Sequence, residues 1–203
     1  MKDEIKHIIS GTSKNSEGTI IQTITSFLRR SETSGGLAKE DKHFKKEETK
    51  NLIEFIAENN FWYPDVNLDN YISEGAEQKV YIKSDESVLK LNDAIYYLSW
   101  LDYLQNLLLH NYFFPDTAYK LLGFYTMDKN LYAVVEQPFV KATNKTDLDK
   151  VRTFLENNGF TNIRNNDYQN DYLGIILEDL HDENVLTQNG VQYFIDTVFY
   201  IIE

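Results

Sequence analysis

The chain has 203 residues, of which 42% are hydrophobic, and its fourteen Tyr and twelve Phe are typical of a folded domain. A formal net charge of -12 argues against a nucleic-acid partner, because phosphate backbones require a cationic face. The sequence contains no Cys, which removes disulfides, thiol chemistry and Cys-ligated zinc. No apolar run has the length of a signal peptide or a membrane span, so the sequence predicts a soluble, cytoplasmic protein without a membrane partner.

The first 65 residues carry helical patterns and no recognisable chemistry, and they predict a helical accessory segment. Apolar residues at helical spacing mark the two helices, and a stretch rich in Ser, Thr, Gly and charged residues separates them. The predicted order is a polar, frayed end at 1–16, a helix at 19–30, a linker at 31–46 and a helix at 46–59.

Strand patterns begin at Tyr71. Residues 72–82 predict a strand, a turn and a second strand, with Gly75 near the turn. Residues 88–91 predict a short apolar strand that contains Lys90. A lone Lys in such a strand is typical of a sheet edge with its ammonium group in solvent, and a functional Lys is the alternative.

The clearest helical pattern covers residues 92–111. Asn92 or Asp93 would begin this helix. The apolar stripe along it consists of Ala94, Ile95, Leu98, Leu101, Leu104 and Leu108.

Two more strands and a helix follow. The strands are predicted at 119–126 and 131–137, and Pro138 ends the second one. A helix capped at its start is predicted from Thr146 to Asn158, and the polar residues 160–170 predict turns.

An acidic, amide-bearing loop lies between two short apolar strands near the end of the chain. We expect the strands at 175–177 and 191–195 to form a hairpin that holds Asp179, Asn184 and Asp196 at one end. Carboxylate and amide oxygens are the ligands that Mg²⁺ prefers. An acidic surface loop without function is the alternative.

The segment Asp-Leu-His-Asp-Glu-Asn-Val-Leu, residues 179–186, resembles the catalytic loop of the protein-kinase-like superfamily, in which an Asp precedes an Asn by five positions. The Ile195-Asp196 pair is similar to the second metal-binding Asp of that superfamily. Over about residues 70–200 the chain most resembles the small serine/threonine/tyrosine kinase domain of polyvalent proteins, which phages and conjugative elements encode.

The resemblance implies an α+β, two-lobed protein-kinase-like fold with a reduced C-lobe and an N-terminal helical extension. Its implied parts are an accessory segment at 1–65, an N-lobe at 66–140 and a truncated C-lobe at 141–203. The implied cofactors are ATP and Mg²⁺, and the implied partners are a nucleotide and a protein substrate.

The resemblance also implies a role for each candidate residue. Asp179 would orient or deprotonate the acceptor hydroxyl, Lys90 would position the phosphates, and His181 would assist at the γ-phosphate. Asn184 and Asp196 would bind the metal. Gly75 and Val80 would belong to the hairpin over the phosphates. The adenine-binding hinge would consist of Glu136, Gln137 and Phe139. Kinases also pair the strand Lys with an acid on the following helix, and Asp102 or Asp93 would take that place here.

Three positions depart from the kinase pattern. Ser73 and Gln78 stand where glycines are expected, and Val198 replaces a Gly two residues after the metal-binding Asp. Two interpretations therefore stay open. The chain is an ATP-dependent phosphotransferase, or it is a catalytically inactive nucleotide-binding pseudokinase or protein-interaction module of a mobile element.

Overall fold

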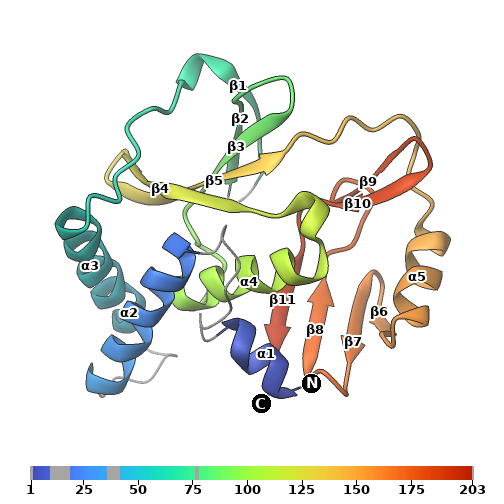
Figure 1. Cartoon of the computed structure of the whole chain (residues 1–203), viewed down its shortest axis with the longest axis horizontal. Helices are drawn as coiled ribbons and strands as arrows, with labels where there is room; N and C mark the ends of the chain where they lie inside the picture. The colour runs from blue at the N-terminus through green and yellow to red at the C-terminus, as the bar shows by residue number, and fades with distance from the viewer. Residues whose placement is uncertain (1, 10–18, 36–41, 76–77, 203) are drawn as a thin grey trace.

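The computed structural model describes residues 2–9, 19–35, 42–75 and 78–202, and within them helices and antiparallel sheets form an α+β fold (Figure 1). The α-helices are α1 (Lys2–Ile9), α2 (Thr19–Gly35), α3 (Lys42–Glu58), α4 (Trp100–Phe113) and α5 (Leu148–Asn157). Two short 3-10 helices add to these, η2 (Leu68–Asn70) and η3 (Pro115–Thr117). None of the helices in the described part of the chain is long and apolar enough to cross a membrane.

The largest sheet has five strands in the order β1-β2-β3-β5-β4. Its strands are β1 (Tyr71–Glu74), β2 (Gln78–Ile82), β3 (Ser87–Asn92), β4 (Lys120–Met127) and β5 (Asn130–Pro138). In the register between β2 and β3, Val80 lies opposite Lys90.

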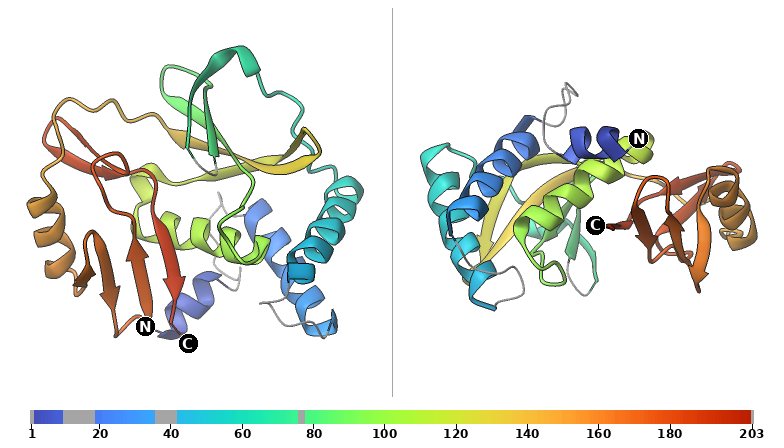
Figure 2. Two further views of the ribbon diagram at one scale, coloured as in Figure 1. Left: turned by 180° about the vertical axis from the view of Figure 1, so that it is seen from behind. Right: turned by 90° about the horizontal axis from the view of Figure 1, so that it is seen from below.

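Two smaller sheets contain the C-terminal strands. The four-stranded sheet has the order β11-β8-β7-β6 and consists of β6 (Thr161–Arg164), β7 (Asp167–Asn170), β8 (Ile175–Glu178) and β11 (Val198–Ile201). The two-stranded sheet consists of β9 (Val185–Gln188) and β10 (Val191–Phe194). Seen from below, α2 and α3 lie at one end of the molecule and these strands with α5 at the other (Figure 2).

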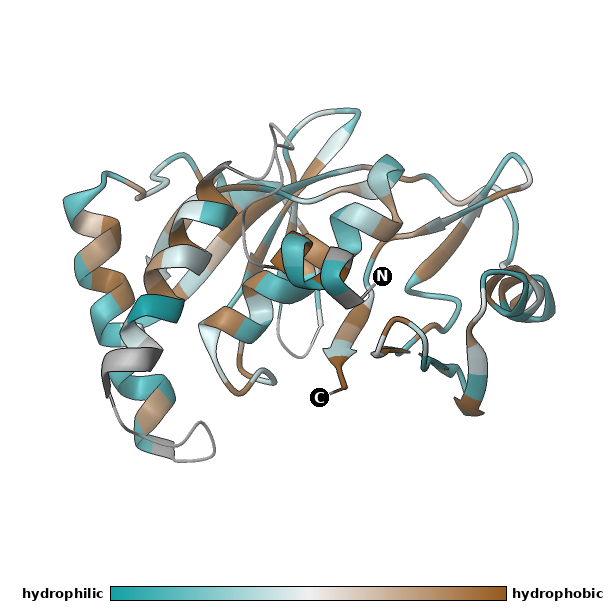
Figure 3. Cartoon of the chain, turned by 60° about the horizontal axis from the view of Figure 1, so that its bottom comes forward, coloured by the Kyte–Doolittle hydropathy of each residue, from teal (hydrophilic) through white to brown (hydrophobic). Residues whose placement is uncertain are grey.

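Both faces of the five-stranded sheet are covered by apolar residues, because side chains alternate between the faces along each strand. Ala133 and Val135 on β5 belong to the main core, which α2, α3 and α4 share. Tyr132 and Val134 pack with Leu89 and Leu91 in a smaller cluster on the opposite face. Figure 3 shows hydrophobic and hydrophilic residues alternating along the helices, as expected for elements with one buried side.

The alternation also determines the direction of Lys90. Leu89 and Leu91 on either side of it face the smaller cluster, so Lys90 points to the face that α4 lies beneath (Figure 1). Its side chain is only 5% exposed. The Lys is therefore not a solvent-facing edge residue.

The N-terminal helices are attached to the sheet and to α4 by specific contacts. The carboxylate of Glu48 on α3 accepts hydrogen bonds from the backbone N–H groups of Trp100 (2.6 Å) and Leu101 (3.2 Å), at the start of α4. The backbone N–H of Phe124 donates to the Phe61 carbonyl oxygen at 2.9 Å. At the neighbouring Gly123, an added Cβ would lie 2.4 Å from the same oxygen. A side chain at Gly123 would therefore separate the two segments.

Several sequence predictions about the N-terminal third are wrong in detail. Residues 2–9 form α1 rather than a frayed end, while residues 1 and 10–16 of that prediction lie outside the described residues. The predicted linker at 31–46 is shortened from both ends, since α2 continues to Gly35 and α3 begins at Lys42, and 36–41 again lie outside the described residues.

The helix predicted at 92–111 begins eight residues late. Ala94 has a φ of 55°, which a right-handed helix does not allow, and the Ser99 hydroxyl accepts the Asp102 N–H as the true N-cap. Ile95 and Leu98, which the sequence assigned to the apolar stripe, are exposed.

Two strand predictions also need correction. The polar stretch 160–170 contains the β6–β7 hairpin rather than turns alone. The strand after residue 174 does not pair with the strand at 191–195, because β7 and β11 occupy both edges of β8. Asp179 therefore follows one sheet, whereas Asn184 and Asp196 flank the β9–β10 hairpin.

Candidate functional site

A pocket of about 360 Å³ lies between the β1–β2 hairpin and the loop that follows β8. It brings together Asp179, His181, Asn184 and Asp196, which are separated by up to seventeen positions in the sequence, with Gly75 and Gln78 from the hairpin. Tyr96, Tyr97 and Tyr200 complete one wall. The three oxygen-bearing residues of the sequence prediction thus share one pocket although they do not share one hairpin.

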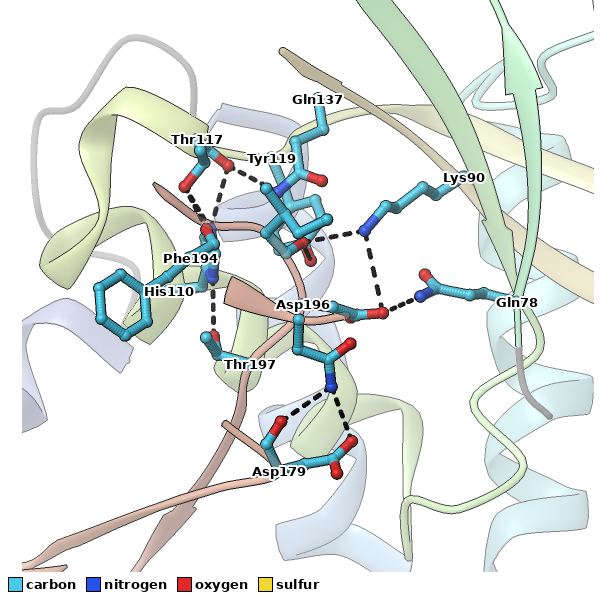
Figure 4. Close-up of polar contacts among 12 residues, drawn as sticks. Gln78, Lys90, His110, Thr117, Tyr119, Gln137, Asp179, Phe194, Asp196 and Thr197 are labelled. Atoms are coloured by element: carbon cyan, nitrogen blue, oxygen red, sulfur yellow. Dashed lines mark hydrogen bonds and ion pairs between the residues drawn. The ribbon is translucent and has the colours of Figure 1, made fainter. Parts of the chain in front are cut away.

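Lys90 contacts the segment that carries Asp196. Its Nζ donates to the Ile195 carbonyl oxygen at 2.9 Å and lies 3.9 Å from Oδ2 of Asp196 (Figure 4). Because the Lys90 side chain is buried, this ion pair is screened less than a surface pair. A positive amine from the large sheet and a carboxylate from the C-terminal part of the chain therefore meet directly.

Asp179 has a backbone conformation that its neighbours hold in place. Its φ of 65° is left-handed, which is uncommon for a residue other than Gly but tolerated by Asp. The side-chain amide of Asn184 donates to both the carbonyl oxygen and Oδ2 of Asp179, each at 2.8 Å. The backbone N–H of Asp179 donates to Oδ1 of Asp167 at 3.1 Å. The loop thereby presents the Asp179 carboxylate at the edge of the pocket.

His181 interacts with the Asp179 carboxylate. Its Nδ1 lies 3.3 Å from the backbone N–H of Glu183, and its Nε2 lies 3.1 Å from the side-chain amide nitrogen of Asn184. Nε2 also lies 3.3 Å from Oδ1 of Asp179. His181 therefore contacts both the Asp179 carboxylate and the Asn184 amide.

A family model described as the serine/threonine/tyrosine kinase found in polyvalent proteins matches residues 45–203, more than half of the chain. The chain belongs to this family. The match begins inside α3, so α3 as well as the sheets lies in the part of the chain that the family model covers. No curated protein and no solved structure matches the chain.

Two side chains in this pocket have oxygens that could bind a metal ion. Among the described residues, no three His, Cys, Asp or Glu side chains cluster as a ready-made metal site. Mg²⁺, however, binds proteins through one or two protein oxygens, with phosphates and waters as its other ligands. Because the Asn184 NH₂ group is directed at Asp179, the amide oxygen is left for a cation, and the Asp196 carboxylate supplies a second ligand. The donor set therefore fits Mg²⁺.

Behind Asp196 lies a buried polar network that the sequence did not reveal. Nδ1 of His110 on α4 lies 2.7 Å from the Thr197 hydroxyl, and Nε2 lies 3.0 Å from the Thr117 carbonyl oxygen. The Gln137 side chain donates to the same carbonyl at 2.8 Å, and the Tyr119 hydroxyl donates to the Ile195 carbonyl at 2.8 Å (Figure 4). The one signal in the sequence was a His directly after three consecutive Leu residues of a largely apolar helix.

Burial determines the protonation states in this network. Burial lowers the pKa of His110 to about 3, the hydrogen bond to Thr117 opposes that change, and the charge of Lys90 adds to it. The pKa of Tyr119 is raised, first by burial and then by the negative charge of Asp196. His110 is therefore neutral, and Tyr119 is a hydroxyl donor.

The residues assigned to the kinase hinge lie at the end of β5 and just after it, and three of their polar groups are already bonded. The Phe139 N–H donates to the Glu86 carbonyl at 2.8 Å, and the Gln137 side chain points inward to Thr117. Glu136 is bound by Lys83 at 2.7 Å; burial would raise its pKa, but hydrogen bonds from Lys83 and Ser87 lower it. Any contact of this stretch with adenine must therefore come from other backbone groups or from the Phe139 ring.

The two acids considered as partners for Lys90 lie at or before the start of α4. Asp102 lies in the first turn of α4 and lines a second pocket with Gln105 and Leu109. Asp93 precedes the helix, and its carboxylate accepts the backbone N–H of Ile95. The carboxylate that the structure brings to Lys90 is that of Asp196.

Proposed function

We propose that this kinase domain transfers the γ-phosphoryl group of ATP to a hydroxyl group, with Mg²⁺ as cofactor. The observation that supports this most directly is the contact of the buried Lys90 with the Ile195-Asp196 segment, beside a pocket that also contains Asp179 and Asn184. Phosphoryl transfer needs positioned charge more than covalent chemistry, and these residues supply it.

In this proposal the five-stranded sheet acts as an N-lobe at 66–140 and the C-terminal strands as a reduced C-lobe at 141–203. The acceptor oxygen forms a bond to the γ-phosphorus, the bond from that phosphorus to the β–γ bridging oxygen breaks, and ADP leaves. Asp179 receives the hydroxyl proton and His181 orients its carboxylate.

Lys90 neutralises phosphate charge, and Gly75 and Val80 shape the hairpin above the phosphates. An added Cβ at Gly75 would meet nothing within 4 Å, so the hairpin is open on that side. Asn184 and Asp196 would hold Mg²⁺, which when bound supplies charge neutralisation to the phosphate oxygens.

One observation favours the alternative of an inactive nucleotide-binding pseudokinase. Gln78 stands where the glycine-rich hairpin of protein kinases in general has a glycine, and its side-chain amide donates to Oδ2 of Asp196. The same oxygen would have to bind a metal in the active enzyme.

A thermal-shift titration with Mg-ATP tests nucleotide binding, and ATP turnover tests catalysis. We expect Mg-ATP to stabilise the wild type, and Asn184→Ala and Asp196→Ala to abolish that stabilisation. Asp179→Ala should keep the stabilisation and lose turnover. Asp182→Ala is the matched control, because Asp182 is in the same loop and its carboxylate lies 3.9 Å from the exposed Lys145.

The outcomes separate the alternatives. Binding without turnover in the wild type would favour the pseudokinase. No stabilisation at millimolar Mg-ATP would contradict both nucleotide-based functions and leave a protein-interaction module.

A further inference from the structure

We propose that His110 on α4 and Thr197 are positioning residues. The hydrogen bond between them holds the Asp196 carboxylate in place for metal binding. This inference rests on the proposed function and extends it to a part of the chain that lines no part of the pocket. Asp196 and Thr197 are adjacent, so a constraint on Thr197 acts directly on the backbone of the proposed metal ligand.

The hydrogen bond between the two residues has a defined direction. A carbonyl oxygen can only accept, so Nε2 of His110, at 3.0 Å from the Thr117 carbonyl, carries the hydrogen of the neutral ring. Nδ1 is then an acceptor, and the Thr197 hydroxyl donates to it at 2.7 Å. Thr117 thus selects the tautomer of His110 that can hold Thr197.

The chain is held on the other side of Asp196 as well. The Ile195 carbonyl accepts from the Tyr119 hydroxyl at 2.8 Å and from Lys90 at 2.9 Å. The Thr117 hydroxyl donates to the Phe194 carbonyl at 2.5 Å. Side chains from α4, η3, β3 and the residue before β4 therefore fix the residues before and after Asp196, as Figure 4 shows.

The burial of this network argues for more than packing. His110 is completely buried, and the Phe114 and Tyr119 rings lie 5.5 Å and 4.5 Å from its ring. An apolar side chain would fill such a site without the cost of desolvating two ring nitrogens. The imidazole instead bonds at both nitrogens, and one of the two bonds reaches the residue next to Asp196.

The arrangement gives α4 a connection to the metal-binding segment. Residues 100–113 contain no Glu, so this helix lacks the acid with which kinase helices usually pair the strand Lys. Here α4 contacts the site through the hydrogen bond between His110 and Thr197. A displacement of the helix would therefore displace Asp196.

Thr197→Val tests the inference, because Val has the shape of Thr without the hydroxyl. The measured quantity is the gain in ATP affinity on adding Mg²⁺, taken as the ratio of the dissociation constants in EDTA and in saturating Mg²⁺. Loss of a residue that orients a metal ligand typically costs about tenfold or more in metal affinity, so we expect the ratio to fall roughly tenfold. ATP affinity in EDTA should stay within about twofold of the wild type, which shows that the variant is folded.

Two further variants distinguish positioning from a general loss of stability. Thr197→Ser restores the hydroxyl and should recover most of the ratio. Thr25→Val is the matched control, because Thr25 is also buried but donates to the Ile21 carbonyl within α2, and it should leave the ratio unchanged.

The outcomes for this inference and for the proposed function are separate. A wild-type ratio of one would overturn the proposed function and this inference with it. If the wild-type ratio is well above one, two results would overturn this inference alone. One is an unchanged ratio in Thr197→Val, and the other is a ratio in Thr197→Ser as low as in Thr197→Val. If Thr197→Val does not fold, Tyr119→Phe provides the test, because it removes one of the two hydrogen bonds to the Ile195 carbonyl on the other side of Asp196. Tyr119→Phe must then lower the ratio, or the inference is wrong.

Discussion

The side-chain amide of Gln78 donates to Oδ2 of Asp196, so a residue on the hairpin of the large sheet is bonded to the proposed metal ligand 118 positions later. The Lys90 ammonium lies 3.9 Å from the same oxygen. One carboxylate oxygen thus has two protein partners, of which one is neutral and half-buried. A cation that binds this oxygen has to compete with the amide.

We therefore expect Gln78→Ala to raise the affinity of the nucleotide complex for Mg²⁺. The amide is partly solvated, so its loss should be worth about 1 kcal/mol, or roughly fivefold in affinity. Titration of Mg²⁺ into the ATP-bound protein measures the change. Gln192→Ala is the control, since its amide donates to the Asp147 carbonyl instead. A weaker affinity in Gln78→Ala would show that the amide supports the site.

Lys90→Met should weaken ATP binding strongly and change stability little. A charge-assisted hydrogen bond to phosphate is worth about 1.5–3 kcal/mol, so we expect a loss of roughly ten- to hundredfold in affinity. Methionine fills the buried volume, and Asp196 is 29% exposed, so water can solvate the carboxylate that the substitution leaves behind. Calorimetric titration with ATP measures the loss, and Lys150→Met on α5 is the control. Equal affinities of the two variants would contradict the role of Lys90.

His110 predicts an acid-sensitive component of stability. Its pKa is lowered from 6.5 to about 3 by burial, so the unfolded chain binds the proton more tightly than the folded one. The stabilisation is complete above pH 6.5 and is lost progressively as the pH falls toward 3. Between pH 7 and pH 5 the wild type should lose about 2 kcal/mol more than His110→Gln, measured by urea unfolding at both values. Equal losses would indicate that His110 is not kept neutral by the fold.

Glu48→Ala should destabilise the fold through the start of α4. The Glu48 carboxylate binds two N–H groups there, where the helix dipole also favours a negative charge. We expect the free energy of unfolding to fall by about 1–2 kcal/mol. Glu47→Ala, an exposed neighbour on α3, should change it by less than about 0.5 kcal/mol. A similar effect of both variants would contradict the capping role.

Local patterns in the sequence were enough to place the strands of the five-stranded sheet and the acidic loop. Apolar runs identified β3 and β5, and the spacing of Asp179 and Asn184 identified the loop. The start of α4 was misplaced because Ile95 and Leu98 continue the helical spacing through a loop, where they are exposed. Periodicity cannot distinguish an apolar residue in a loop from one on a helix face.

Relationships over long distances in the sequence were not predictable. The pairing of β8 with β11 depends on which edges other strands occupy, and no local pattern contains that information. The same is true of His110, whose partner Thr197 lies 87 positions later. Both relationships are seen in the three-dimensional structure and not in any local segment of the sequence.

The pairing of β11 with β8 has a consequence for how the proposed activity is controlled. Val198 lies opposite Glu178 in the antiparallel pair of β11 and β8. Strand pairing therefore holds the residues just after Asp196 next to those just before Asp179. In many kinases a flexible segment after the metal-binding Asp swings between on and off positions. Here such a movement would break the pairing of β11 with β8. We therefore expect the proposed activity to be set by the supply of substrates rather than by a rearrangement of this segment.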